Sequence, residues 1–140
     1  MSLENGKCAN CGCILVLDDS KESGVCKYCG NELNILQALR KYKTEGINKF
    51  EFLILTADQA IKYREDYDTA LDKYKQALNI RPDDYRIYWG IFLCEIDLIK
   101  KRCEKDCLSA VIADWGRRAY ELAPEKTKPY YLQKLREAEK

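Results

Sequence analysis

The chain has 140 residues, of which 46% are apolar and 34% charged, so it can bury one modest core or join a small module to a larger one. The formal net charge is +1, which divides as −1 for residues 1–31, with three Lys and four Asp or Glu, and +2 for the remainder. Neither part is basic enough to indicate a nucleic-acid-binding protein. Since no apolar run is long enough to cross a bilayer and the first residues are polar, the sequence predicts a soluble cytoplasmic protein.

The first informative segment repeats one short motif, C-x-x-C-G, at residues 8–12 and 26–30. A thiolate pair with this spacing can grip one tetrahedral ion, and two such pairs complete its coordination shell. Glycine after each second cysteine suits a turn with positive φ. The motif therefore predicts one structural zinc ion held by Cys8, Cys11, Cys26 and Cys29. A rubredoxin-like iron site is the first alternative, and disulfides or free thiols are the second.

The doubled motif resembles the zinc ribbon family. The segment between the two motifs, residues 13–25, is expected to form the hairpin of such a ribbon, with an apolar strand, a polar turn and a short return strand. Four cysteine ligands leave no open position for water or substrate. We therefore expect the metal to fold this segment without activating a nucleophile.

After residue 31 the apolar residues recur with the helical period, in six segments joined by short connections. The expected helices run from Asn31 to Gly46, over about 47–64 and 67–80, from Asp83 or Asp84 through Ile99, over about 104–122, and from Thr127 to 139. The predicted fold class is mainly α, with a small β zinc ribbon followed by an antiparallel helical-hairpin array of about six helices. The expected division is 1–31 for the ribbon, 32–46 for a connecting helix and 47–140 for the helical domain.

Residues 67–82 carry the pattern on which a second resemblance rests. Ala70 and Ala77 are small where two helices would cross, Tyr74 lies between them, and Pro82 follows the helix. This pattern resembles the tetratricopeptide repeat family, with repeats at about 51–84 and 85–126 and a capping helix at 127–139. The first helix of the first repeat departs from the family pattern, because Asp58 stands where a small residue is usual. The second repeat is longer than the family's, so an insertion is expected around residues 99–106.

The resemblance implies a concave surface, lined by the first helix of each repeat, that holds a peptide or a partner protein. The positions that correspond to this surface are Phe52, Leu55, Gln59, Lys62, Tyr63, Arg86, Trp89, Leu93 and Asp97. The predicted partner-binding residues among them are Gln59, Lys62, Tyr63, Arg86, Trp89 and Leu93. In the competing interpretation Trp89 and Leu93 belong to the core, and Lys62 and Arg86 are simply solvated.

The remaining cysteines are Cys13, Cys94, Cys103 and Cys107. Cys13 is expected in the first strand of the ribbon. The other three are expected to be small buried hydrophobes, with a second thiolate site as the alternative.

The sequence favours binding over catalysis, because it has no histidine, no phosphate-binding glycine loop and no nucleophile elbow. The preferred hypothesis is a non-catalytic adaptor that binds a protein or peptide. The alternative is a zinc ribbon protein associated with nucleic acid in transcription or translation. Asp18, Asp19 and Glu22 in the expected hairpin turn oppose this alternative, since they would repel phosphates. A second copy of the chain could supply further burial for the short array, so a homodimer is also considered.

Overall fold

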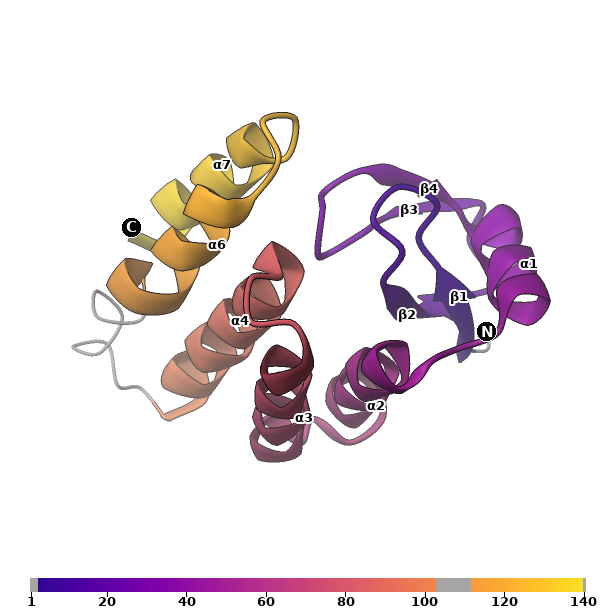
Figure 1. Cartoon of the computed structure of the whole chain (residues 1–140), viewed down its shortest axis with the longest axis horizontal. Helices are drawn as coiled ribbons and strands as arrows, with labels where there is room; N and C mark the ends of the chain where they lie inside the picture. The colour runs from indigo at the N-terminus through magenta and orange to yellow at the C-terminus, as the bar shows by residue number, and fades with distance from the viewer. Residues whose placement is uncertain (1–2, 103–111, 140) are drawn as a thin grey trace.

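The computed structural model describes residues 3–102 and 112–139 and is shown in Figure 1. Its elements are β1 (Leu3–Lys7), β2 (Ile14–Asp18), β3 (Ser23–Val25), β4 (Glu32–Asn34), α1 (Ile35–Glu45), α2 (Lys49–Arg64), α3 (Tyr67–Ile80), α4 (Tyr85–Arg102), the π-helical turn η2 (Ile112–Gly116), α6 (Arg117–Leu122) and α7 (Lys128–Glu139). The predicted fold class, a small β region followed by an antiparallel helical array, is confirmed.

The β region contains two hairpins, and each hairpin is closed by one cysteine motif. β1 pairs with β2 across residues 8–13, and β3 pairs with β4 across residues 26–31. The prediction that residues 13–25 form one hairpin is therefore wrong, because β2 and β3 lie in different two-stranded sheets. The physical reason is that each C-x-x-C-G motif is itself the tight turn that reverses the chain, so its flanking strands become partners. We call residues 8–12 and 26–30 the first and second knuckle, and residues 3–34 the ribbon.

Side-chain caps explain where most helices begin. Asn48 accepts a hydrogen bond from the backbone N–H of Glu51 at the start of α2, and Asp66 does the same for Thr69 at the start of α3. The cap of α1 is Asn34, which accepts from the N–H of Gln37, and not Asn31 as predicted. The shift arises because residues 32–34 pair as a strand first.

The later start of α1 changes which of its side chains face the core. Ile35, Ala38 and Leu39 are buried, while Leu36, which follows the same helical period, is 57% exposed. The predicted end at Gly46 is confirmed, since its φ is +74° and its N–H donates to the carbonyl of Tyr42.

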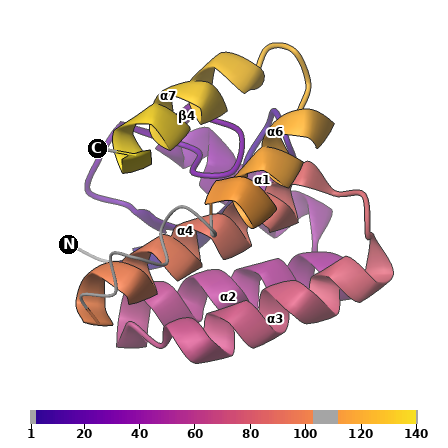
Figure 2. The same cartoon turned by 90° about the vertical axis from the view of Figure 1, so that its left-hand side faces the viewer.

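Helices α2, α3, α4 and α6 pack in sequence as neighbours, and α7 covers the last face (Figure 2). Ala70, Tyr74 and Ala77 are completely buried where α3 meets its neighbours, as their spacing predicts. Asp84 accepts a hydrogen bond from the N–H of Arg86 at the start of α4, and α7 begins directly after Thr127, so both predicted boundaries are confirmed. Within the range predicted as a fifth helix, the structure describes η2 and α6. The first part of that range lies outside the described residues.

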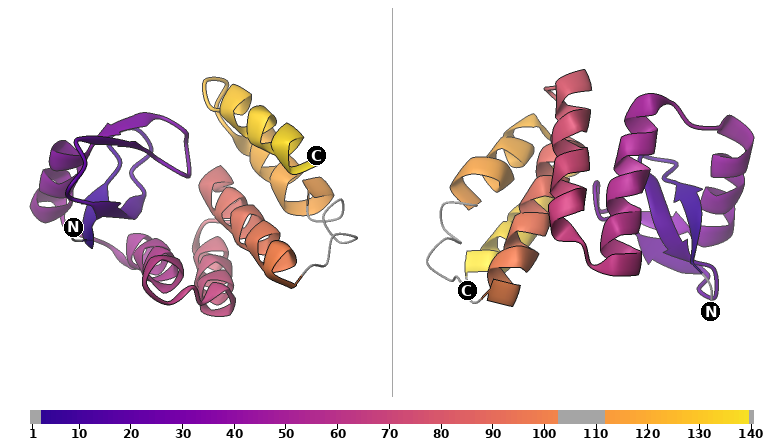
Figure 3. Two further views of the ribbon diagram at one scale, coloured as in Figure 1. Left: turned by 180° about the vertical axis from the view of Figure 1, so that it is seen from behind. Right: turned by 90° about the horizontal axis from the view of Figure 1, so that it is seen from below.

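The helices form an arc, and the ribbon lies on the concave side of that arc (Figures 1 and 3). Lys7 of β1 forms 3.0 Å ion pairs with Glu45 at the end of α1 and with Glu51 in the first turn of α2. One buried cluster joins ribbon residues such as Leu15 and Leu33 to helix residues such as Ile54. The largest core is therefore shared by the ribbon and the helices.

The second knuckle is the part of the ribbon that reaches deepest into the helices. Lys27 Nζ lies 2.6 Å from Oδ1 of Asp58, a fully buried carboxylate on α2, whose Oδ2 accepts a 2.5 Å hydrogen bond from the N–H of Val16. Burial opposes the charge of Lys27, but Tyr74 and Asp58 beside the ammonium raise its pKa, so this residue stays protonated. One carboxylate thus binds both hairpins of the ribbon.

Tyr28, the other residue between the two cysteines of this knuckle, is also completely buried. Its hydroxyl lies 2.6 Å from that of Tyr74, and the two rings meet edge to face at a centroid distance of 6.3 Å. Its carbonyl accepts a hydrogen bond from the hydroxyl of Tyr131 on α7. Tyr28 therefore contacts both α3 and α7 of the helical array.

Gly90 of α4 leaves the space that this tyrosine pair occupies. A Cβ at Gly90 would lie 2.8 Å from the ring of Tyr74 and 3.2 Å from that of Tyr28. We expect Gly90→Ala to lower the free energy of unfolding by about 1–3 kcal/mol in urea denaturation, although alanine is the better helix former. The matched control is Gly24→Ala, whose Cβ would meet only the end of Ile35 at 3.4 Å, and it should change stability by less than about 1 kcal/mol. A Gly90→Ala protein as stable as wild type would show that the ribbon is not held against α4.

Removal of the buried carboxylate tests the other half of this contact. Asp58→Ala leaves the Lys27 ammonium and the Val16 N–H without their partner, so we expect a loss of about 3 kcal/mol in urea denaturation. Asp72→Ala is the control, because it removes an exposed carboxylate of α3 that accepts a hydrogen bond from Gln76, and it should cost less than about 0.5 kcal/mol. In a double-mutant cycle with Lys27→Met, a coupling energy near zero would contradict the ion pair.

Candidate metal centre and the surface of the helical array

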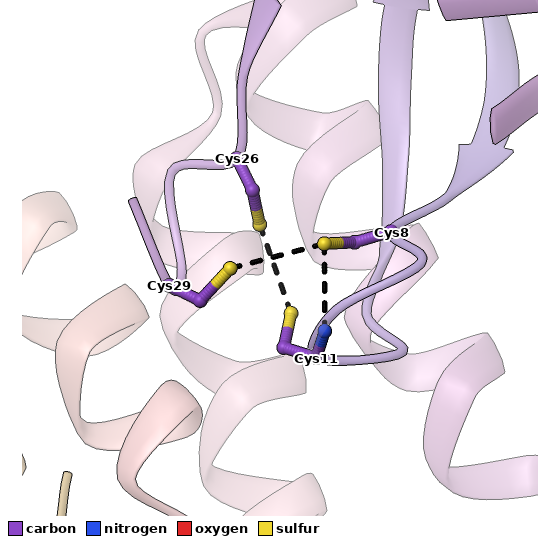
Figure 4. A group of neighbouring side chains, drawn as sticks. All are labelled: Cys8, Cys11, Cys26 and Cys29. Atoms are coloured by element: carbon purple, nitrogen blue, oxygen red, sulfur yellow. Dashed lines mark hydrogen bonds between the residues drawn. The ribbon is translucent and has the colours of Figure 1, made fainter. Parts of the chain in front are cut away.

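The four predicted ligand sulfurs come together at the tips of the two hairpins (Figure 4). The sulfurs of Cys8, Cys11, Cys26 and Cys29 all lie within 4.8 Å of one another. The Sγ atoms of Cys8 and Cys29 are 3.8 Å apart, and those of Cys11 and Cys26 are 3.7 Å apart. For a metal–sulfur bond of about 2.3 Å, the edge of a regular tetrahedron is about 3.8 Å. The four residues therefore fit one tetrahedral metal ion.

The backbone of the two knuckles is the same. In each, the N–H of the glycine donates to the carbonyl of the first cysteine, from Gly12 to Cys8 at 2.9 Å and from Gly30 to Cys26 at 2.8 Å. The φ angles of the two glycines are +83° and +80°, which confirms the conformation expected from the motif. The turn also brings the N–H of Cys11 to 3.5 Å from Cys8 Sγ. The first knuckle thus directs a backbone N–H toward one of its own sulfurs.

The negative charge of the four thiolates favours a cation at this cluster. A hydrogen bond with Cys11 raises the pKa of both the Cys8 and the Cys26 thiol, whereas hydrogen bonds from Cys11, Cys26 and Cys8 lower the pKa of Cys29. Asn31 adds an amide donor 3.5 Å from Cys29 Sγ. Four thiolates at these distances would repel one another strongly, so full deprotonation requires a bound cation. The arrangement of the four sulfurs is compatible with the exchange of thiol protons for a metal ion.

Cys13 and Cys94 do not belong to this cluster. Cys94 is buried in α4, where burial raises the pKa of its thiol to about 12, and it is the small core residue that the sequence predicts. Cys13 is also completely buried, but it lies directly before β2 and not in the first strand as predicted. Cys103 and Cys107 lie outside the described residues. Within residues 3–102 and 112–139, the group at Cys8, Cys11, Cys26 and Cys29 is the cluster with metal-ligand geometry.

The predicted partner-binding residues separate into two groups. The first group faces the interior or the ribbon. Trp89 is completely buried, with its ring 3.9 Å from that of Tyr131 and 4.7 Å from that of Phe92, so the competing interpretation as a core residue applies. Leu93 is half-buried against the same cluster. Arg86 pairs with Asp84 and donates to the carbonyl of Cys11 in the first knuckle.

These residues do not line an open groove, because the ribbon already occupies the concave side of the helical arc. Leu55 of α2, another predicted surface position, packs against Ile14 and Val16 of β2. Arg86 and Leu55 therefore bind the chain's own ribbon. Asp97 is half-buried on α4.

The second group lies on the outer side of α2. Phe52 and Tyr63 are 57% and 52% exposed, Lys62 is exposed and Gln59 is half-exposed. These side chains remain largely accessible because α2 packs against α3 on one side and against β2 on another. The hydroxyl of Tyr63 also donates a 3.3 Å hydrogen bond to the carbonyl of Leu3 at the start of β1.

Sequence reasoning missed Asp58 as a contact of the ribbon. The available signal was its departure from the repeat pattern, a carboxylate where a small residue is usual. A buried charge at such a position needs a partner. The partners of Asp58 are Val16 and Lys27, which lie 42 and 31 positions earlier in the chain. A break in a local pattern thus marked a long-range contact.

No helix among the described residues has the length and apolar character needed to cross a membrane. Comparison of the chain with protein-family models, with curated proteins and with solved structures gave no match. The function is therefore inferred from the geometry of the molecule.

Proposed function

We propose that this protein is a non-catalytic protein-binding module with one structural zinc ion. In this proposal the metal folds the ribbon, the ribbon completes a tetratricopeptide-like helical array, and the outer side of α2 contacts a protein partner. The observation that carries the proposal is the exposure of Phe52 and Tyr63 on a helix whose other sides are packed. Large aromatic side chains exposed on one face commonly mark an interaction site.

Zinc is the metal we propose because four cysteine ligands in a tetrahedron are typical of structural zinc sites. The shell is closed by protein ligands, which supports a role in folding over a role in hydrolysis. Iron in the same ligand set is the alternative. Cys8, Cys11, Cys26 and Cys29 would hold either ion.

Elemental analysis by mass spectrometry tests the metal. We expect one zinc per chain in wild type, loss of the metal in Cys26→Ser, and retention in the control Cys94→Ser, which alters a buried cysteine outside the cluster.

Chelation should also lower the melting temperature of the helices in far-ultraviolet circular dichroism, because the ribbon and the helices share one core. Iron in place of zinc would contradict the proposed metal. A melting temperature of the helices that chelation leaves unchanged would contradict the proposed role of the metal in folding.

Affinity capture from cell extract with the full-length, metal-loaded chain tests the partner surface. We expect wild type to recover a protein that the double variant Lys62→Glu/Tyr63→Ala loses, because both side chains are exposed. The variant also removes the 3.3 Å hydrogen bond from the Tyr63 hydroxyl to the carbonyl of Leu3, so circular dichroism must show that its fold is retained. Lys75→Glu, at an exposed position of α3, is the control and should retain the protein. Arg86 and Trp89 are unsuitable test positions, since both support the fold.

Two results would count against this proposal. Recovery of the same proteins by wild type and the double variant would exclude the outer side of α2 as the surface. A salt-dependent shift of labelled RNA or DNA at micromolar protein, with no protein recovered, would favour the nucleic-acid alternative.

A further inference from the structure

The outer side of α2 carries a row of four residues with the spacing of a helix-packing seam. Phe52, Thr56, Gln59 and Tyr63 follow one another at intervals of four, three and four, which places them on one face. We call these residues the α2 seam. The hydroxyl of Thr56 donates to the carbonyl of Phe52 at 2.8 Å, so its hydrogen-bonding capacity is already used within the helix. The seam can therefore accept an apolar neighbour.

The charges beside the α2 seam have one sign. Lys49 and Lys62 are exposed and form no ion pair with any residue that the structure describes. The two carboxylates of α2 are both paired toward the ribbon, Glu51 with Lys7 and Asp58 with Lys27. The α2 seam is thus an aromatic row flanked by cations whose counter-charges face elsewhere.

This charge pattern selects among the possible occupants. A second copy of α2 packed against the seam would bring two further lysines and no carboxylate to pair with them, because Glu51 and Asp58 are already paired with the ribbon. Nucleic acid would gain only these few cations, beside a ribbon whose net charge is negative. A helix with an apolar stripe between acidic residues satisfies both the aromatic row and the lysines.

From these observations we infer that the α2 seam binds an acidic amphipathic helix of a partner protein. The partner's apolar residues would pack against Phe52 and Tyr63, and its carboxylates would pair with Lys49 and Lys62. This inference deepens the proposed function and rests on it, since it assigns the chemistry of the partner at the same face. The bound helix would extend the array by one layer beyond α2.

Selection from a displayed library of helical peptides tests the inference without a known partner. The library fixes leucine along one helical face and randomises the flanking positions among Glu, Gln and Lys. The bait is the full-length, metal-loaded protein. We expect wild type to enrich peptides with Glu on both flanks, and the charge-reversed variant Lys49→Glu/Lys62→Glu to bind those peptides about tenfold more weakly and to enrich Lys instead.

Matched variants separate the seam from general electrostatics. Lys75→Glu/Lys100→Glu makes the same change of net charge at exposed positions on α3 and α4, and it should select the same peptides as wild type. Phe52→Ser should abolish binding of the selected peptides. Circular dichroism on each variant confirms that the fold is retained.

Each other outcome overturns the inference in a distinct way. Enrichment without acidic bias, no enrichment at all, or peptides that bind the charge-reversed variant equally well would exclude an acidic partner. Binding of a single-stranded RNA that Lys49→Glu/Lys62→Glu abolishes would assign the face to nucleic acid. A dimer in sedimentation that Phe52→Ser dissociates would assign it to a second copy. If no acidic peptide binds while capture of a protein from extract still depends on Lys62 and Tyr63, the protein-binding proposal stands. Only the inference that the partner presents an acidic helix would then be wrong.

Discussion

The contact on which the rest of the molecule depends is made by Lys27 and Tyr28, the two residues between the cysteines of the second knuckle. Lys27 pairs with the buried Asp58 of α2, and Tyr28 meets Tyr74 of α3 and Tyr131 of α7. A ribbon of about 30 residues cannot bury a core of adequate size alone, and a short helical array leaves its concave side open. Each part supplies what the other lacks, because these side chains project from the metal-binding turn into the helices.

This arrangement changes where a partner can bind. A concave surface in an array of helical hairpins is the obvious place for a ligand, but here β2 packs against Leu55 and the first knuckle bonds to Arg86. Of the predicted surface positions, those that stay accessible lie on the outer side of α2, at the end of the array rather than inside it. A partner bound there, as we propose, would be recognised by the side chains and charges along one convex helix face.

Much of the fold could be read from the sequence because the signals were local. The C-x-x-C-G spacing fixes the metal ligands, Gly46 ends α1, and Asp66 and Thr127 mark helix starts within a few residues. The pairing of the strands was not predictable in the same way, since each knuckle acts as a turn and brings β1 to β2 and β3 to β4. The positions of Arg86 and Trp89 depend on contacts with Cys11 of the first knuckle and Tyr131 of α7, which lie 75 and 42 residues away in the chain. No periodicity within α4 carries that information.

The position of the second knuckle also links two equilibria. Cys26 and Cys29 belong to the proposed metal site, and the residues between them hold the ribbon against the helices, so the same turn serves both tasks. When an ion is bound there, thermodynamic reciprocity requires that a change which detaches the ribbon from the helices weakens ion binding by the same factor by which the bound ion strengthens that attachment. The affinity for the ion would then measure how firmly the two halves of the chain are joined.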